Sequence, residues 1–354
     1  MRILHLVLAP RLSGAEVLAK DLAIHQKSCG ETVAMASLLP QHADFVALHG
    51  DLEAREVTCM FPERSYGRLG RLWWLHSVVR RFKPDVLLAH STIPAFYARV
   101  LPLGVPVIYV MHSATNDFVH AKVRGIERML SRRARAVIGV SENNVREYIE
   151  AIGRHRMMQV IPNGVDTSRY FYPTGTEDSG RPPQILQVGR YNPIKSHLQT
   201  VRAFAQICHA VPDLRLKLVG VLEVPSYFAA VQDLVRQLGL EQRVTVDGPR
   251  SNISQLLAEA TVYAMPSLSE AHSIALLEAL ATGIPVVANT ISGFAYARNF
   301  PCVQLIDTND TDAYAKALLT ALRQPRTVRQ LAGLTLGDAA EQYLAISRKV
   351  AFAA

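Results

Sequence analysis

The chain has 354 residues, of which 49% are hydrophobic and only 19% are charged. This length suits two domains of moderate size, and the composition excludes a largely disordered chain. The four cysteines are scattered without a CxxC pair, so we expect neither a disulfide framework nor a zinc site, as suits a reducing cytoplasm.

The net charge of +8 is concentrated in the first half of the chain. Residues 1–172 carry 22 Lys and Arg against 15 Asp and Glu, whereas the remainder carries 16 against 15. The asymmetry indicates either an anionic partner, such as membrane lipid, acidic glycan or nucleic acid, or ordinary solubilising charge. No zinc finger or RNP segment accompanies the charge, so we do not expect nucleic acid to bind.

The first element is an apolar stretch over residues 3–8 that we interpret as a β-strand. The stretch is short, His5 interrupts it and Arg11 soon follows, which disfavours a secretory signal. No run of about 18 apolar residues occurs, so we expect no membrane-spanning helix. We expect an amphipathic helix next, over residues 15–28. Three further strands are expected over residues 86–89, 105–111 and 136–140.

A basic segment between these strands contains both tryptophans of the chain. Its residues of interest are Arg64, Arg68, Arg71, Trp73, Trp74, Arg80, Arg81 and Lys83. Arginine beside tryptophan and leucine is typical of an interfacial amphipathic segment, and predicts binding to the cytoplasmic surface of an anionic membrane. A second basic cluster follows over residues 122–135. The alternative is an ordinary helix with both tryptophans in the core and a solvated basic face.

Residues 173–182 are polar and rich in turn residues, and we interpret them as an interdomain linker between domains 1–172 and 183–334. Beyond the linker, short apolar runs alternate with helical stretches, which predicts a parallel sheet covered on both faces. The expected strands are 185–188, 214–219, 244–247, 262–265 and 285–288. A last helix, over about residues 335–354, completes the chain.

The most informative segment is residues 266–287, where a strand leads through a loop into a helix. We expect that helix to begin beside Glu270, so that its free N–H groups face a ligand. Glu278, eight residues on, would then lie about two turns along on nearly the same face. Two such carboxylates can bind hydroxyls at opposite ends of an elongated, hydroxyl-rich ligand. The alternative is one acid favoured by the helix dipole and one solvated acid.

This segment resembles the E-x7-E signature of the family-4 retaining glycosyltransferases. The resemblance implies the GT-B fold, in which two facing Rossmann-like domains with parallel sheets enclose a cleft, and in which the final helix crosses back onto the first domain. It also implies that Glu270 faces the donor sugar and Glu278 the ribose. The remaining donor-binding residues of the segment are Ala271, His272, Ser273 and Ile274. Many relatives have glycine where this chain has Ala271 and Ser273, and this variant resembles bacterial lipopolysaccharide and envelope-glycan transferases.

A second motif is Gly189 and Arg190 followed by Lys195, in a loop after a predicted strand. Two cations there can neutralise a diphosphate leaving group without a metal, although two surface charges at a helix end would look alike. The motif resembles the family pattern, which implies that Arg190 and Lys195 hold the donor diphosphate. The Asp310–Asp312 pair precedes a predicted helix and is interpreted as a cap, so we expect no metal or other cofactor.

The first domain offers weaker signals. Ser13 and Gly14 follow the first strand and resemble a glycine loop of the family, although a plain turn has the same composition. His112 lies at the end of a strand, where parallel sheets bind ligands, and a structural histidine is the alternative. By resemblance, His112 approaches the donor sugar, and His90 is a weaker candidate.

The resemblance therefore implies a retaining, metal-independent hexosyltransferase whose catalytic residues are Arg190, Lys195, Glu270 and His112. We expect a nucleotide-sugar donor, a UDP-sugar rather than GDP-mannose, and a glycan or lipid-linked acceptor in bacterial envelope synthesis. We expect a cytoplasmic protein that is peripheral on the inner membrane. The alternatives are a sugar-nucleotide epimerase or a glycan phosphorylase of the same fold, or a non-catalytic sugar-nucleotide sensor.

Overall fold

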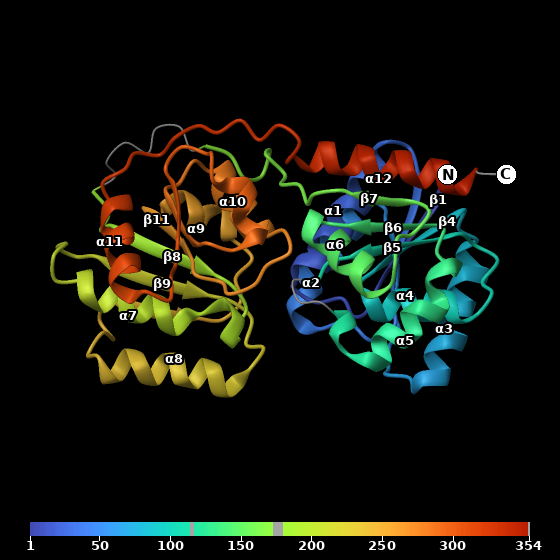
Figure 1. Ribbon diagram of the computed structural model, residues 1–354, viewed down its shortest axis with the longest axis horizontal. Coiled ribbons are helices and arrows are strands. Elements are labelled where there is room, and N and C mark those ends of the chain that lie inside the picture. Colours follow the sequence, from blue (N-terminus) through green and yellow to red (C-terminus); the bar gives the residue numbers. More distant parts are fainter. Residues whose placement is uncertain (114–116, 173–179, 353–354) are drawn as a thin grey trace. The chain divides into compact units, whose positions relative to one another are not determined.

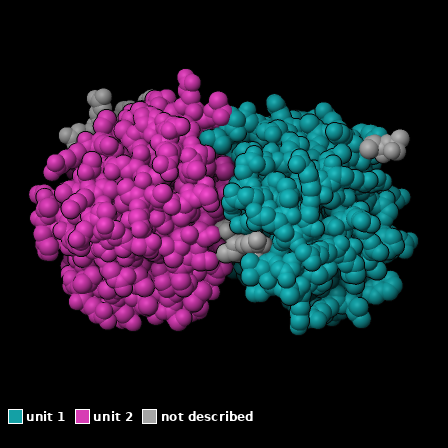
Figure 2. Space-filling view, viewed as in Figure 1, with its two compact units in different colours: residues 1–164, 333–354 teal, residues 165–332 magenta. Residues whose placement is uncertain are grey.

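The computed structural model describes residues 1–113, 117–172 and 180–352 (Figure 1). The chain forms two compact units, with residues 1–164 and 333–354 in unit 1 and residues 165–332 in unit 2 (Figure 2). Each unit contains one sheet, and every strand pair observed in the described residues is parallel. The prediction of an α/β protein with two Rossmann-like parallel sheets is confirmed.

The sheet of unit 1 has the strand order β3-β2-β1-β4-β5-β6-β7. Its strands are β1 (Arg2–Val7), β2 (Thr32–Ser37), β3 (Thr58–Met60), β4 (Val86–His90), β5 (Val107–Met111), β6 (Ala136–Gly139) and β7 (Met158–Val160). The chain adds strands on one side of β1 and then returns to place β4 on its other side. The topological switch point, where open α/β sheets bind their ligands, therefore lies between β1 and β4.

Helices cover both faces of this sheet. They are α1 (Gly14–Ser28), α2 (Val46–Ala54), α3 (Arg68–Phe82), α4 (Thr92–Val100), α5 (Ala121–Leu130), α6 (Glu142–Ala151) and α12 (Leu336–Ala351). Along β1, Leu4 and Leu6 pack on the side of α3 and α4, so the alternate residues His5 and Val7 face the side of α1. The final helix α12 contacts α1 and β4 within unit 1 (Figure 1).

The sheet of unit 2 has the order β10-β9-β8-β11-β12-β13. Its strands are β8 (Gln184–Val188), β9 (Arg215–Val219), β10 (Val244–Asp247), β11 (Val262–Met265), β12 (Val286–Asn289) and β13 (Val303–Ile306). Its helices are α7 (His197–Ile207), α8 (Pro225–Gln237), α9 (Ile253–Glu259), α10 (Ile274–Ala281) and α11 (Thr311–Ala321). One large core joins the sheet to α7, α8 and α11. The switch point of this sheet lies between β8 and β11.

The chain passes from unit 1 to unit 2 earlier than the sequence suggested. Residues 165–172 belong to unit 2, whereas the sequence placed them in the first domain. The reason is packing, since a β-carbon at Gly283 would lie only 2.6 Å from Cδ2 of Tyr172. Residues 173–179 of the expected linker lie outside the described residues. At the crossing, a β-carbon at Gly164 would lie 2.1 Å from the carbonyl oxygen of Thr335, so only glycine fits there.

Candidate donor site

The two most informative sequence motifs meet at the carboxyl edge of the unit 2 sheet. The loop with Arg190 and Lys195 follows β8, and the loop over residues 266–273 follows β11, its neighbour across the switch point. The backbone N–H of Leu268 donates to the carbonyl oxygen of Ile194, 2.8 Å away. The sequence motifs, about 75 residues apart in the chain, therefore form one continuous surface at the place where such sheets bind ligands.

The loop after β8 is held close to the sheet by glycine. A β-carbon at Gly220, after β9, would lie 1.8 Å from the carbonyl oxygen of Gly189, so the backbones touch. The stem of Lys195 packs over Gly189, whose β-carbon would lie 3.4 Å from Cγ of the lysine. The side chain of Gln187 donates to the carbonyl oxygen of Lys195 at 2.7 Å and braces the loop from below. These contacts fix where the lysine emerges.

Both cations of this loop are paired with carboxylates. Lys195 forms an ion pair with Glu270, and the two side chains are only 16% and 12% exposed. Arg190 forms an ion pair with Glu223, which also accepts a hydrogen bond from the side chain of Asn192. The structure thus brings together three of the predicted catalytic residues. Glu223 was missed because it lies in a loop after β9 with no motif around it.

The expected relation between Glu270 and Glu278 is wrong. The helix α10 begins at Ile274, four residues after Glu270, because Ser273 is the N-cap and its Oγ accepts the N–H of Leu276 at 3.3 Å. Glu270 therefore lies in the loop, and the eight-residue spacing is not two helical turns. Glu278 lies within α10 and is half-buried. The buried donor-binding candidates of the segment are Ala271, His272 and Ser273.

A third loop, after β12, adjoins the loop that contains Glu270. It includes the 3-10 helix η5 (Ser292–Ala297). A β-carbon at Gly293 would lie 2.0 Å from the carbonyl oxygen of Glu270, so this glycine supports the acidic loop directly. The ring of Tyr296 stacks on His272 with 4.3 Å between centroids. Burial lowers the pKa of His272 to about 4, so the stacked imidazole is neutral at pH 7.

The candidates of unit 1 lie at the carboxyl edge of its own sheet. Gly14 is the exposed first residue of α1, and the preceding Ser13 donates a hydrogen bond from its hydroxyl to Glu16. His112 follows β5 and is half-buried, with Nε2 at 2.9 Å from Nδ1 of His90. Burial lowers the pKa of His112 to about 4. The predicted pair of histidines thus forms one hydrogen-bonded unit.

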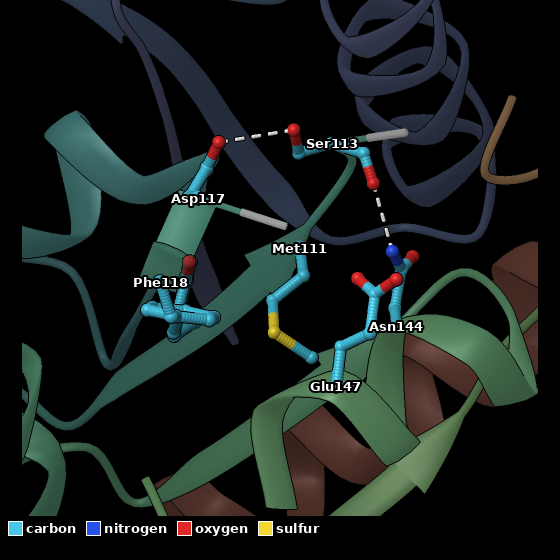
Figure 3. A pocket seen from close by; sticks show the side chains of 7 residues that line it. Met111, Ser113, Asp117, Phe118, Asn144 and Glu147 are labelled. Atoms are coloured by element: carbon cyan, nitrogen blue, oxygen red, sulfur yellow. Dashed lines mark hydrogen bonds between the residues drawn. The ribbon is translucent and has the colours of Figure 1, made fainter. Parts of the chain in front are cut away.

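A small cavity lies beside the end of β5 (Figure 3). Its lining residues are Tyr109, Met111, Ser113, Asp117, Phe118, Asn144 and Glu147. The hydroxyl of Ser113 donates to Asp117 at 3.1 Å, and Asn144 donates to the carbonyl oxygen of Ser113 at 2.8 Å (Figure 3). With a volume of about 20 Å³, the cavity has room for roughly one water molecule, so it is not a sugar site.

The two tryptophans of the basic segment have different environments. Trp73 is 75% exposed on α3, beside Leu69 at 74% one turn earlier. Trp74 packs against the core and donates from Nε1 to the carbonyl oxygen of Ser37 at 2.8 Å, so its assignment to the exposed surface is wrong. The exposed cations of the segment are Arg64, Arg68, Arg80, Arg81 and Lys83, while Arg71 is half-buried. Within the described ranges, no helix combines the length and apolarity needed to cross a bilayer.

The Asp310–Asp312 pair is a helix cap, as predicted. The carboxylate of Asp310 accepts the N–H groups of Asp312 and Ala313 at 3.1 and 3.0 Å, at the first turn of α11. Such a bond satisfies donors that have no partner inside the helix. Asp310 therefore caps α11.

The sequence matches two family models that together span most of the chain. Residues 12–169 match the model of Glycosyltransferase Family 4, and residues 174–333 match that of Glycosyl transferases group 1. The N-acetyl-alpha-D-glucosaminyl L-malate synthase of Bacillus anthracis is 24% identical over 280 residues, which cover 75% of this chain and 72% of the relative. The UDP-Gal:alpha-D-GlcNAc-diphosphoundecaprenol alpha-1,3-galactosyltransferase of Escherichia coli is 25% identical over 265 residues, 69% of this chain and 68% of the relative.

Among solved structures, the fold is similar to that of Anabaena HepE in complex with UDP and glucose. The TM-score is 0.79 at 21% sequence identity, and the superposition covers 99% of this chain and 100% of the other. Because the sequence identity is low, this likeness establishes the fold alone.

Proposed function

The chain belongs to the family-4 glycosyltransferases of the GT-B fold, and on this premise we propose that it transfers a hexose-type sugar, with retention and without a metal, from a nucleoside diphosphate to a lipid-linked or glycan acceptor. The observation that supports the proposal best is the junction of the two loops of unit 2. There a cation and a carboxylate, Lys195 and Glu270, emerge side by side from the carboxyl ends of β8 and β11.

In the proposed reaction, diphosphate departs against Arg190 and Lys195. The bond from the sugar C1 to the diphosphate oxygen breaks, and the acceptor oxygen bonds to C1 on the same face. The hydroxyl proton of the acceptor passes to the departing diphosphate oxygen. Because the leaving group itself takes the proton, this front-face step requires no enzyme nucleophile.

The ion pairs of the two loop cations give the site a preformed charge pattern. Lys195 is held by Glu270 and Arg190 by Glu223, so each cation has a partner until a diphosphate replaces it. We infer that donor binding transfers both cations to the phosphates and leaves Glu270 to accept sugar hydroxyls. Charge-assisted bonds from two cations then stabilise the charge that develops on the leaving group.

Arg190 and Lys195 neutralise the charge of the leaving diphosphate, a role for which other transferases use a divalent ion. EDTA is therefore expected to leave turnover unchanged. Complete inhibition by EDTA, reversed by Mn²⁺, would contradict this part of the proposal.

The donor is proposed to be a UDP-sugar. The similar HepE structure holds UDP and glucose, and the E. coli relative is a UDP-Gal transferase. A thermal-shift screen of UDP- and GDP-sugars tests this choice, because a ligand at 100 times its dissociation constant adds about 2.7 kcal/mol of stability. UDP-sugars should raise the melting temperature, and release of free UDP with a suitable acceptor should follow. A shift with GDP-mannose alone would refute the UDP assignment.

The acceptor is proposed to be lipid-linked, reached from the surface of an anionic membrane. The E. coli relative acts on a diphosphoundecaprenol-linked sugar. In unit 1, Leu69 and Trp73 lie one turn apart on α3, exposed, with Arg80 further along the same side. A basic hollow of about 520 Å³ near the end of α5 has Arg128, Arg132, Arg154 and Arg156 among its lining residues. Each cation near an anionic leaflet contributes about 1 kcal/mol.

Co-sedimentation with liposomes tests the membrane proposal. Binding should require anionic lipid, weaken with salt, and fall on Trp73→Ser, because the exposed indole would enter the interface. The control is Val46→Ser on α2, another apolar side chain, which is 62% exposed. Equal recovery with neutral and anionic vesicles, or equal loss for both variants, would contradict the proposal.

A further inference from the structure

Four side chains form a continuous hydrogen-bonded chain inside unit 1. Oε1 of Gln26, on α1, lies 2.8 Å from Nε2 of His5, and Nδ1 of His5 lies 3.0 Å from Nε2 of His90. Nδ1 of His90 in turn lies 2.9 Å from Nε2 of His112. Adjacent rings stack with 5.2 Å between centroids in both pairs. The chain runs from the buried face of α1 to the carboxyl edge of β5.

The three histidines come from the three adjacent strands that flank the switch point of unit 1. His5 is in β1, His90 ends β4 and His112 follows β5. Gln26, His5 and His90 are buried, whereas His112 is half-buried. Only the last member of the chain therefore reaches the edge where an α/β sheet binds its ligand.

All three imidazoles are neutral near pH 7. Burial lowers the pKa of His5 and His112 to about 4, and burial together with the neighbouring histidines lowers the pKa of His90 well below its usual value. A neutral imidazole has one N–H donor and one acceptor nitrogen. Each histidine can therefore donate to one neighbour only while accepting from the other, so the chain has a single direction.

Gln26 sets this direction. Its Oε1 accepts from His5, which places the proton of His5 on Nε2 and leaves Nδ1 to accept from His90. His90 then carries its proton on Nε2 and accepts at Nδ1 from His112. The proton of His112 is consequently on Nε2, and its Nδ1 is an acceptor. Rotating the amide of Gln26 by half a turn would reverse every bond in the chain.

We propose that Gln26, His5 and His90 are positioning residues that hold His112 as the tautomer with its proton on Nε2, which leaves Nδ1 as a hydrogen-bond acceptor for a substrate hydroxyl group at the carboxyl edge of the unit 1 sheet. An acceptor nitrogen favours an O–H group and disfavours a phosphate oxygen, which has no proton to donate. At this edge of unit 1, His112 therefore favours a sugar hydroxyl group over a phosphate group. This role of His112 rests on the proposed function, whereas its tautomer does not.

Imidazole ¹⁵N NMR of the full-length protein at pH 7 tests the tautomer without any substrate. In the wild type, His112 should carry its proton on Nε2. Gln26→Leu removes the acceptor that sets the direction, and should shift the tautomer ratio of His112 by roughly fivefold, as expected for one net hydrogen bond. His155 is a buried histidine of unit 1 that does not belong to the hydrogen-bonded series of side chains. Its signal reports whether the variant is folded, and should not change. A proton on Nδ1 in the wild type, or an unchanged ratio in the variant, would overturn the inference.

Kinetics then test whether the chain acts through His112. Gln26→Leu should lower kcat/KM for the donor by roughly the same fivefold as the tautomer ratio. Added to His112→Ala, it should cause no further loss, because a positioning residue has no effect once its target is absent. Additive losses would contradict the positioning role. Failure of the wild type to use any nucleotide sugar would contradict the proposed function, while the NMR result would still support the tautomer assignment.

Discussion

Replacing Lys195 with methionine separates the structural from the catalytic role of the ion pair with Glu270. Methionine keeps much of the aliphatic stem over Gly189 but removes the charge. The carboxylate of Glu270 then loses its cationic partner, although its side chain is only 12% exposed. A partly buried charge without its partner costs about 1–3 kcal/mol, less than the value for a fully buried pair because some solvent reaches both groups.

Lys195→Met should therefore lower the free energy of unfolding by about 1–3 kcal/mol in urea denaturation. It should also lower turnover by roughly 100-fold, as expected when a charge-stabilising donor is removed from a transition state. Adding Glu270→Gln removes the uncompensated charge and should restore most of the stability. It should not restore turnover, because the diphosphate still lacks its cation.

A direct contact of Lys195 with the diphosphate requires that stability and turnover respond differently to the double change. If the double variant regained both stability and turnover, Lys195 would act only by holding Glu270, and its assignment to the diphosphate would be refuted. If neither single nor double variant changed stability, the ion pair would contribute nothing in solution.

Two further predictions concern packing. Arg99 and Glu127 form a salt bridge with both side chains fully buried, so Glu127→Gln should destabilise the protein by about 3–5 kcal/mol. The double change Arg99→Met with Glu127→Leu removes both charges and should cost much less stability. Equal losses of unfolding free energy in urea denaturation would contradict this expectation. Gly293→Ala places a β-carbon against the carbonyl oxygen of Glu270 and should lower kcat by roughly tenfold or more. The control is Gly50→Ala, whose β-carbon meets nothing within 4 Å and which should leave kcat unchanged. Equal rates for both variants in steady-state assays would contradict this role of Gly293.

The sequence predicted several strands closely where valine or isoleucine stands among their residues. β10 and β11 were predicted with their observed bounds, and β1 and β8 within one residue. Three strands of unit 1 were missed. β2 reads as Thr-Val-Ala-Met-Ala-Ser, whose alanines favour helix, and the edge strands β3 and β7 have three residues each. Their conformation comes from pairing with neighbouring strands rather than from local preference.

For the site, local motifs identified residues but not their partners. The Gly-Arg and Glu loops were found because their spacing is characteristic. The start of α10 was misplaced, because the helix is capped by Ser273 and not by a residue beside Glu270. Glu223 and Gly293 act through contacts with residues 33 and 23 positions away, Arg190 and Glu270. Pairings of this kind depend on which strands become neighbours, so no window of sequence contains them.

Titration calorimetry with UDP, in the presence of EDTA, tests the central claim most directly. We expect the wild-type protein to bind UDP and Glu278→Ala to weaken binding by roughly tenfold or more, as for the loss of a charged hydrogen bond to the ribose. Glu270→Ala should retain UDP binding, because UDP lacks the transferred hexose that Glu270 is proposed to contact. The change also frees Lys195 for the diphosphate. Absence of binding to both UDP and GDP, or equal loss in the two variants, would contradict the assignment of this edge of unit 2 as the donor site.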